Sequence, residues 1–235
     1  MKTIYHLTII PHCTVKCSKV LSYLVICYSA LCAFSCKTQI QQRSFESVCG
    51  KEKSMITWNE KTENNIIFLT TSQNSEIHHY RLSRLCTTLS WQLTDSIKHT
   101  NLTISLYNNY YYFKGVFNNR PYSKTVKSKG YPWYQNIAYS AGQTVNKNCI
   151  KYECFRPDNL ELYVMQAERK ATTVLFNNQK AYEIKVKLTG ILSHFWSCLY
   201  YFNVANHQFI DYKGVNGSPG TPETIIKAKQ LIPNY

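Results

Sequence analysis

The sequence predicts a mainly β protein, a curved antiparallel half-barrel of about 8 to 11 strands covered by one or two short helices. Three observations support this fold class. The chain contains 19 tyrosines, 10 phenylalanines and 4 tryptophans, and aromatic side chains suit a half-buried pleated surface. Apolar and polar residues alternate through several segments. Asparagine-rich turns separate these segments, as expected for antiparallel hairpins.

The first element is an apolar run from Val20 to Phe34, preceded by Lys16 and Lys19. Its uncharged length of about fifteen residues is short for a transmembrane helix, which needs about twenty. A cationic start, an apolar middle and small residues at the end are typical of a secretory signal. We therefore expect residues 1–35 to be a cleaved signal peptide.

The residue after the expected cleavage site is Cys36, and the letters "AFSC" resemble a loose bacterial lipobox. This resemblance implies that Cys36 receives lipid and anchors the protein to a membrane. Residues 36–53 would then form a lipidated tether or an unpaired first strand, and residues 54–235 a single β domain with a C-terminal helix. The expected location is the bacterial cell envelope, in the periplasm or on the outer-membrane surface. An uncleaved anchor and plain secretion remain alternatives.

The net charge is +14, and removal of the signal with its three lysines leaves +11. A basic protein attracts phosphates and other anions. Lysines at alternate positions, such as Lys185 and Lys187, are typical of a solvated strand face. The denser patch over 120–130 is a candidate contact for an anionic membrane or a glycan. Since an exported protein rarely meets nucleic acid, we expect no nucleic-acid partner.

The cysteines outside the signal and the expected anchor are odd in number, so at least one lacks an intramolecular partner. Cys149 and Cys154 would lie on opposite faces of a continuous strand, which prevents a disulfide between them. Their spacing also fails the zinc patterns. We expect neither a metal nor a cofactor. The five residues are Cys49, Cys86, Cys149, Cys154 and Cys198.

Three segments of the expected domain show clear strand patterns. Residues 101–128 read as a three-stranded meander with Asn-Asn turns at 108–109 and 118–119. Residues 172–190 form a hairpin around a third Asn-Asn pair. Residues 191–204 are apolar or aromatic on both faces, which favours a central strand, and residues 207–215 follow as its hairpin partner.

Two segments instead predict helices. Trp133, Ile137 and Ala141 recur four residues apart within 131–145, which indicates a short helix or helical loop on the sheet. At the end of the chain, Thr221 and Pro222 suit the N-cap and first position of a helix that carries Ile225, Ile226 and Leu231. This pattern predicts an amphipathic C-terminal helix.

The strand rhythm, together with "RPDNLELYVMQAERK" and "FWSCLYYFNVANHQFIDYKGVNGSPGTP", resembles uncharacterised exported bacterial proteins with a lipoprotein-carrier-like half-barrel. The resemblance covers about residues 54 to 230. It implies a curved antiparallel sheet that holds a hydrophobic ligand against helices. It assigns no catalytic residue.

The sequence contains no G-x-S-x-G elbow, H-E-x-x-H motif or glycine-rich phosphate loop. His194 and Cys198 would lie about 13 Å apart along the expected strand, too far for a nucleophile and its base. Asp158 beside Arg156 fits a turn-stabilising pair better than a general acid. No catalytic residue is therefore assigned.

Four aromatic residues are the candidate ligand-binding site, although core packing is the competing interpretation for each of them. They are Trp133, Tyr134, Phe195 and Trp196. The favoured function is a non-enzymatic exported lipoprotein that binds a hydrophobic or lipid-like ligand between sheet and helix. One alternative is a glycan-binding or structural envelope module, in which aromatic rings form a row on the outer face. A second alternative is a hydrolase with an unrecognised site.

Overall fold

The computed structural model describes residues 40–143, 147–176, 179–190, 193, 196–215 and 221–229. Their strands form one fourteen-stranded antiparallel sheet that is not closed, with one short helix among the described residues. The N-terminal strands are β1 (Gln41–Cys49), β2 (Glu52–Glu63), β3 (Ile66–Gln73), β4 (Glu76–Leu82), β5 (Thr88–Asp95), β6 (Thr100–Tyr107), β7 (Tyr110–Phe117) and β8 (Arg120–Lys127). The later elements are α2 (Ile137–Gln143), β9 (Cys149–Phe155), β10 (Leu162–Phe176), β11 (Gln179–Leu188), β12 (Ser197–Asn203), β13 (Phe209–Val215) and β14 (Glu223–Ala228).

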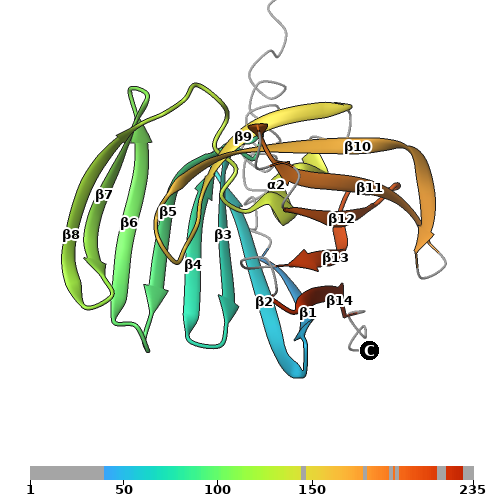
Figure 1. The fold of residues 1–235 in the computed structure, drawn as a ribbon, viewed down its shortest axis with the longest axis horizontal. Helices are drawn as coiled ribbons and strands as arrows, with labels where there is room; N and C mark the ends of the chain where they lie inside the picture. Colours follow the sequence, from blue (N-terminus) through green and yellow to red (C-terminus); the bar gives the residue numbers. More distant parts are fainter. Residues whose placement is uncertain are drawn as a thin grey trace, which may run out of the picture. The chain divides into compact units, whose positions relative to one another are not determined.

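The strand order consists of two meanders joined at one non-local pair. Strands β8 to β1 follow one another in reverse order, β14 pairs with β1, and the order then runs down to β9 (Figure 1). The β1–β14 register aligns Val48 with Ile225. The mainly β class and the antiparallel sheet are confirmed, with more strands than the sequence predicted.

Asparagine pairs form several of the tight hairpin turns. Asn64 and Asn65 have φ angles of 47° and 65°, and the pairs at 108–109 and 118–119 have similar values. Two consecutive residues with positive φ make the turn whose twist matches paired strands, and asparagine tolerates this conformation better than most residues. The predicted meander over 101–128 is therefore confirmed as β6, β7 and β8.

The predicted C-terminal helix is wrong, because residues Glu223–Ala228 form strand β14. The segment contains Thr224, Ile225 and Ile226 in succession, and β-branched side chains favour strands over helices. Its backbone also pairs on both sides, with β1 and with β13. Hydrogen bonding to the two neighbouring strands therefore outweighed the helix preference indicated by Thr221 as an N-cap and Pro222 as the first helical residue. Leu231 lies outside the described residues.

Part of the expected tether is a strand of the sheet. β1 lies within residues 36–53, and it pairs with β2 and β14, so the sheet begins at Gln41 and not at residue 54. The expected signal peptide and Cys36 lie outside the described residues. Within the described ranges, no helix is both long enough and apolar enough to cross a membrane.

The sheet has a core face, which carries most of the buried side chains, and an opposite outer face. The short helix α2 lies on the core face near β13, as the sequence predicted. It follows Asn136, whose side-chain Oδ1 accepts a hydrogen bond from the Tyr139 amide at 3.1 Å. A Cβ on Gly142 would lie 2.3 Å from the His207 carbonyl oxygen, so only glycine lets the helix approach this closely.

Candidate functional site

The segment 128–135 joins the two meanders through a buried carboxylate, Glu153 of β9. Glu153 is fully buried. Its Oε2 accepts a hydrogen bond from the Tyr111 hydroxyl at 2.7 Å. Its Oε1 accepts bonds from the Ser128 hydroxyl at 3.1 Å and from the amides of Lys129 and Tyr131 at 2.8 and 2.9 Å. Four donors therefore compensate the burial of this carboxylate, which ties β7 to β9.

Gln135 makes a second set of bonds at the same junction. Its side-chain Nε2 donates a hydrogen bond to the Phe155 carbonyl oxygen at 2.8 Å, and its side-chain Oε1 accepts one from the Phe155 backbone amide at 2.9 Å. Oε1 also accepts from the Trp133 indole at 3.0 Å. The Gln135 backbone amide donates to Thr88 Oγ1 at 3.0 Å. We call the contacts of Glu153 and Gln135 the junction.

Two of the four candidate ligand-binding residues lie in the junction segment and are buried. Trp133 is fully buried, and its ring meets that of Tyr111 edge-on at a centroid distance of 5.1 Å. Tyr134 packs at 5.7 Å against Tyr152, and burial raises the pKa of its hydroxyl. Both side chains contribute to the core, which was the competing interpretation for each of them.

The other two candidates precede β12 in the sequence. Trp196 is partly buried, and its indole nitrogen donates to the Val215 carbonyl at 2.7 Å. Phe195 lies outside the described residues. The three described candidates therefore belong to two separate regions, and none of them lines the cavity described next.

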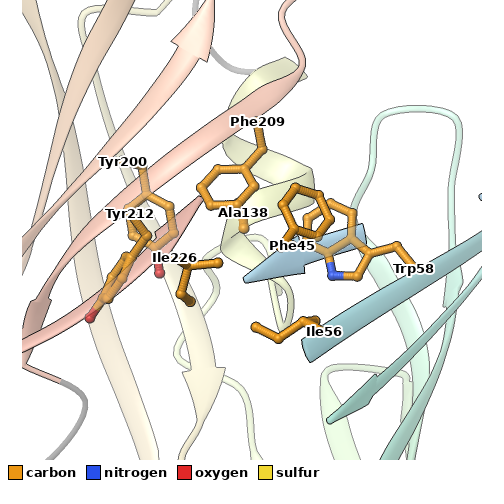
Figure 2. A pocket seen from close by; sticks show the side chains of 8 residues that line it. All are labelled: Phe45, Ile56, Trp58, Ala138, Tyr200, Phe209, Tyr212 and Ile226. Carbon is orange, nitrogen blue, oxygen red and sulfur yellow. The ribbon is translucent and has the colours of Figure 1, made fainter. Parts of the chain in front are cut away.

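An apolar cavity of about 90 Å³ lies on the core face and is partly open to solvent. It is formed where the two meanders meet, because its walls come from β1, β2, β12, β13, β14 and α2. Figure 2 shows the lining side chains gathered around this space. They are Phe45, Ile56, Trp58, Ala138, Tyr200, Phe209, Tyr212 and Ile226.

Aromatic contacts hold the walls of the cavity in place. Trp58 and Phe209 stack with their ring centroids 5.8 Å apart, although one residue comes from each meander. Phe45 contacts both of these rings, at 4.7 and 5.4 Å. On the other side, Tyr200 and Tyr212 meet edge-on at 5.0 Å. These offset and edge arrangements are the favourable ones for aromatic pairs.

The two titratable side chains that line the cavity, Tyr200 and Tyr212, are uncharged at neutral pH. Burial raises the pKa of the Tyr200 and Tyr212 hydroxyls well above the usual tyrosine value. Burial also raises the pKa of the neighbouring Cys198 thiol, and it raises that of Cys154 to about 12. The site therefore favours an uncharged apolar group over a charged one.

His78 lies beside the Glu76 carboxylate, and both of its ring nitrogens contact other side chains. Its Nδ1 accepts a hydrogen bond from the Trp91 indole at 3.1 Å, and its Nε2 lies 3.5 Å from the Glu76 carboxylate. The ring also lies nearly parallel to the rings of Tyr80 and Trp91, at centroid distances of 6.0 and 5.8 Å. These contacts fit a structural role for His78 in the packing of β4 against β5.

The described cysteines and the Arg156–Asp158 pair were also candidates for reactive groups. All five described cysteines are free thiols. The side chain of Arg156 bonds to both Asp158 oxygens, as predicted for a turn-stabilising pair. His194 lies outside the described residues. In the described part of the chain, no group of three or more His, Cys, Asp or Glu residues could hold a metal ion.

No protein-family model matches the chain, and no curated protein matches it.

Sequence reasoning missed both the cavity and the junction. Phe45 fell in the expected tether, and Ile226 in the expected C-terminal helix, so two walls of the cavity were assigned to other structures. Alternation alone could have indicated that Phe45 and Ser47, both buried, share one face of a strand. No signal in the sequence distinguished Glu153 from an ordinary exposed glutamate of a strand.

Proposed function

We propose that this protein is a non-enzymatic binding protein that takes an apolar group into the cavity between α2 and the strands of both meanders. The observation that carries the proposal is the lining of that cavity, which is aromatic and aliphatic with neutral hydroxyls. Apolar walls with a few polar groups are typical of small-molecule sites. This hypothesis retains the hydrophobic ligand that the sequence predicted, but it moves the site to other residues.

The cavity volume limits the size of the group that enters. An engineered protein cavity of about 150 Å³ binds benzene, and the present cavity has a volume of about 90 Å³. It accommodates the end of an alkyl chain, not a whole lipid. Since the cavity is partly open, the remainder of an amphiphile would stay outside. We therefore propose a single-chain amphiphile as the ligand class.

The test is a titration of the purified full-length chain with decanoate. Tryptophan fluorescence is the readout, because Trp58 lines the cavity. We expect a saturable change in fluorescence with the original protein. Ala138→Leu should abolish it by filling the cavity, whereas Ala138→Ser, which adds little volume, should retain it. Thermal unfolding of both variants would verify that each is folded. A signal that survives Ala138→Leu in folded protein would overturn the proposal.

Export and lipid attachment belong to the same proposal. They are supported by the charge, apolar length and cysteine of the N-terminal sequence, all outside the described residues. In a bacterial host, labelled palmitate should enter the original protein and not the Cys36→Ser variant. If neither the original protein nor the Cys36→Ser variant incorporated the label, lipid anchoring would be contradicted, and secretion without an anchor would be the alternative. The resemblance to lipoprotein-carrier-like half-barrels, and the cell-envelope location that it implies, remain part of this proposal.

A further inference from the structure

The outer face of β3 to β8 carries no carboxylate. Between Glu63 and Glu153, the chain contains only two acidic residues, Glu76 and Asp95. Both lie on the same face of the sheet as the buried core residues of their strands, and both bond to Lys98, at 3.0 and 3.2 Å. Their charges are therefore turned away from the outer face and partly neutralised.

The strand register arranges the outer-face side chains in rows, one residue from each strand. The first row is Thr70, His79, Gln92, Thr103, Lys114 and Ser123. The second row is Phe68, Arg81, Ser90, Ser105, Tyr112 and Thr125. With neighbouring strands about 4.8 Å apart, each row runs for about 24 Å. Hydroxyl and amide groups make up most of these rows, and cations are interspersed among them.

Exposed tyrosines lie at one end of this surface. Tyr107 and Tyr110 face each other across β6 and β7, and Lys127 of β8 is the next residue in the same row. Tyr112 lies two residues further along β7. The three tyrosines are 67%, 39% and 43% exposed, respectively. Their ring faces are therefore accessible to a ligand, in contrast to the buried rings of the core face.

The outer face of the other meander has a different charge arrangement. There, Glu168 pairs with Lys187 at 2.7 Å, and Glu223 pairs with Lys213 at 3.8 Å. Glu183 likewise pairs with Lys170. Among the described residues, no salt bridge reaches Arg81, Lys114 or Lys127. The cations of β4, β7 and β8 thus keep their charge available for an external anion.

We infer that the outer face of β3 to β8 binds an anionic polysaccharide. Its unpaired cations complement acidic groups spaced along a polymer, its hydroxyl and amide rows match sugar hydroxyls, and its tyrosine faces suit the C–H groups of a sugar ring. Nucleic acid, with one charge per phosphate, calls for denser Lys and Arg. A membrane surface calls for apolar side chains that insert beside the cations.

The test is isothermal titration calorimetry of the full-length chain with alginate, a carboxylated polysaccharide, and with neutral dextran as the uncharged control. We expect binding to alginate only, and we expect added salt to weaken it. The double variant Lys114→Gln/Lys127→Gln should weaken binding by about five- to twentyfold, the product of two exposed ion pairs. Tyr110→Ala/Tyr112→Ala should weaken it without changing the salt dependence.

The matched control is Lys185→Gln/Lys213→Gln, which removes the same charge from the outer face of the other meander and should retain binding. An equal loss in this control would overturn the inference, because net charge would then explain the effect. Failure of alginate to bind, or equal binding of dextran, would also overturn it. The inference would also be overturned if phosphatidylglycerol vesicles or single-stranded DNA bound more tightly than alginate and depended in the same way on Lys114 and Lys127. None of these variants touches the cavity, so the two proposals fail separately.

Discussion

Two carboxylates, Glu153 in the junction and Asp211 on the outer face of β13, are buried to nearly the same extent, with exposures of 0% and 2%. Their surroundings differ. Four hydrogen-bond donors reach the oxygens of Glu153, whereas Asp211 Oδ2 has no hydrogen-bond partner among the described residues. Since burial is nearly equal, the two sites differ in the number of hydrogen-bond donors that compensate for the lost water.

Electrostatics at Asp211 agree with this interpretation. Burial raises the pKa of its carboxyl to about 7, and the nearby Lys227 and Lys213 offset only part of the effect. Lys227 is the residue opposite Asp211 on β14. The attraction of two lysines is thus weaker than the loss of hydration. At Glu153, by contrast, directed hydrogen bonds replace the lost water at both oxygens.

The largest expected effect comes from Glu153→Ala, which would leave the donors of Tyr111, Ser128, Lys129 and Tyr131 without their acceptor. We expect the free energy of unfolding to fall by about 3–5 kcal/mol, since several buried donors lose their partner at once. Urea denaturation followed by circular dichroism measures the change.

Glu153→Gln is the matched control for charge, because it retains one acceptor oxygen while removing the negative charge. We expect it to cost about 1–2 kcal/mol, less than the alanine variant. Equal losses in the two variants would mean that the charge, and not the set of acceptor contacts, is what matters at this position, which would break the contrast with Asp211.

Gln135→Ala tests whether the junction depends on Glu153 alone. The substitution removes three side-chain hydrogen bonds to Trp133 and Phe155, so we expect a loss of about 1–3 kcal/mol in unfolding free energy. Gln92→Ala is the control, because its side-chain bond to Asn101 lies on the exposed outer face. A loss as large in the control would show that the position within the junction is irrelevant.

Asp211→Asn should have the opposite sign. Asparagine keeps the shape without the charge, so at pH 8 we expect a gain of about 2–4 kcal/mol in unfolding free energy. At pH 4, where the folded protein already holds Asp211 protonated, the gain should be close to zero. Chemical denaturation at both pH values measures the difference.

The sign follows from proton uptake. The folded protein releases the Asp211 proton near pH 7, whereas the unfolded chain releases it near pH 3.9, the ordinary aspartate value. This group therefore stabilises the folded state fully below about pH 4, and that contribution is lost as the pH rises through 7. Asp158→Asn, at an exposed turn, is the control. A pH-independent gain at position 211 would contradict the raised pKa.

Local sequence patterns predicted the hairpins and the helix well. Asn108, Asn109, Asn118 and Asn119 adopt the left-handed backbone that the sequence implied, because their short side chains tolerate positive φ. The meander of β6 to β8 follows from those turns and from strict alternation. Ile137 and Ala141, which share one helical face, lie in α2 as their spacing indicated, whereas Trp133 precedes the helix and forms an isolated bridge with Glu153.

Non-local pairing was beyond these patterns. The contact of Val48 with Ile225 joins residues from opposite ends of the described chain, and no local period encodes such a partner. A short segment with Ile225 and Ile226 fits a helix or a strand equally well until neighbouring strands supply hydrogen-bond partners on both sides. The donors around Glu153 come from residues that approach each other only in the folded sheet.

The sequence by itself determined the class of this protein, its antiparallel hairpins and the scarcity of acidic residues over β3 to β8, because turn chemistry, alternation and composition are local properties. Only the tertiary structure decided that β14 pairs with β1, that the walls of the cavity come from both meanders, and that the described residues give Glu153 four hydrogen-bond donors but leave Asp211 Oδ2 without one. The physical reason is that burial and hydrogen-bond partners depend on which distant strands become neighbours.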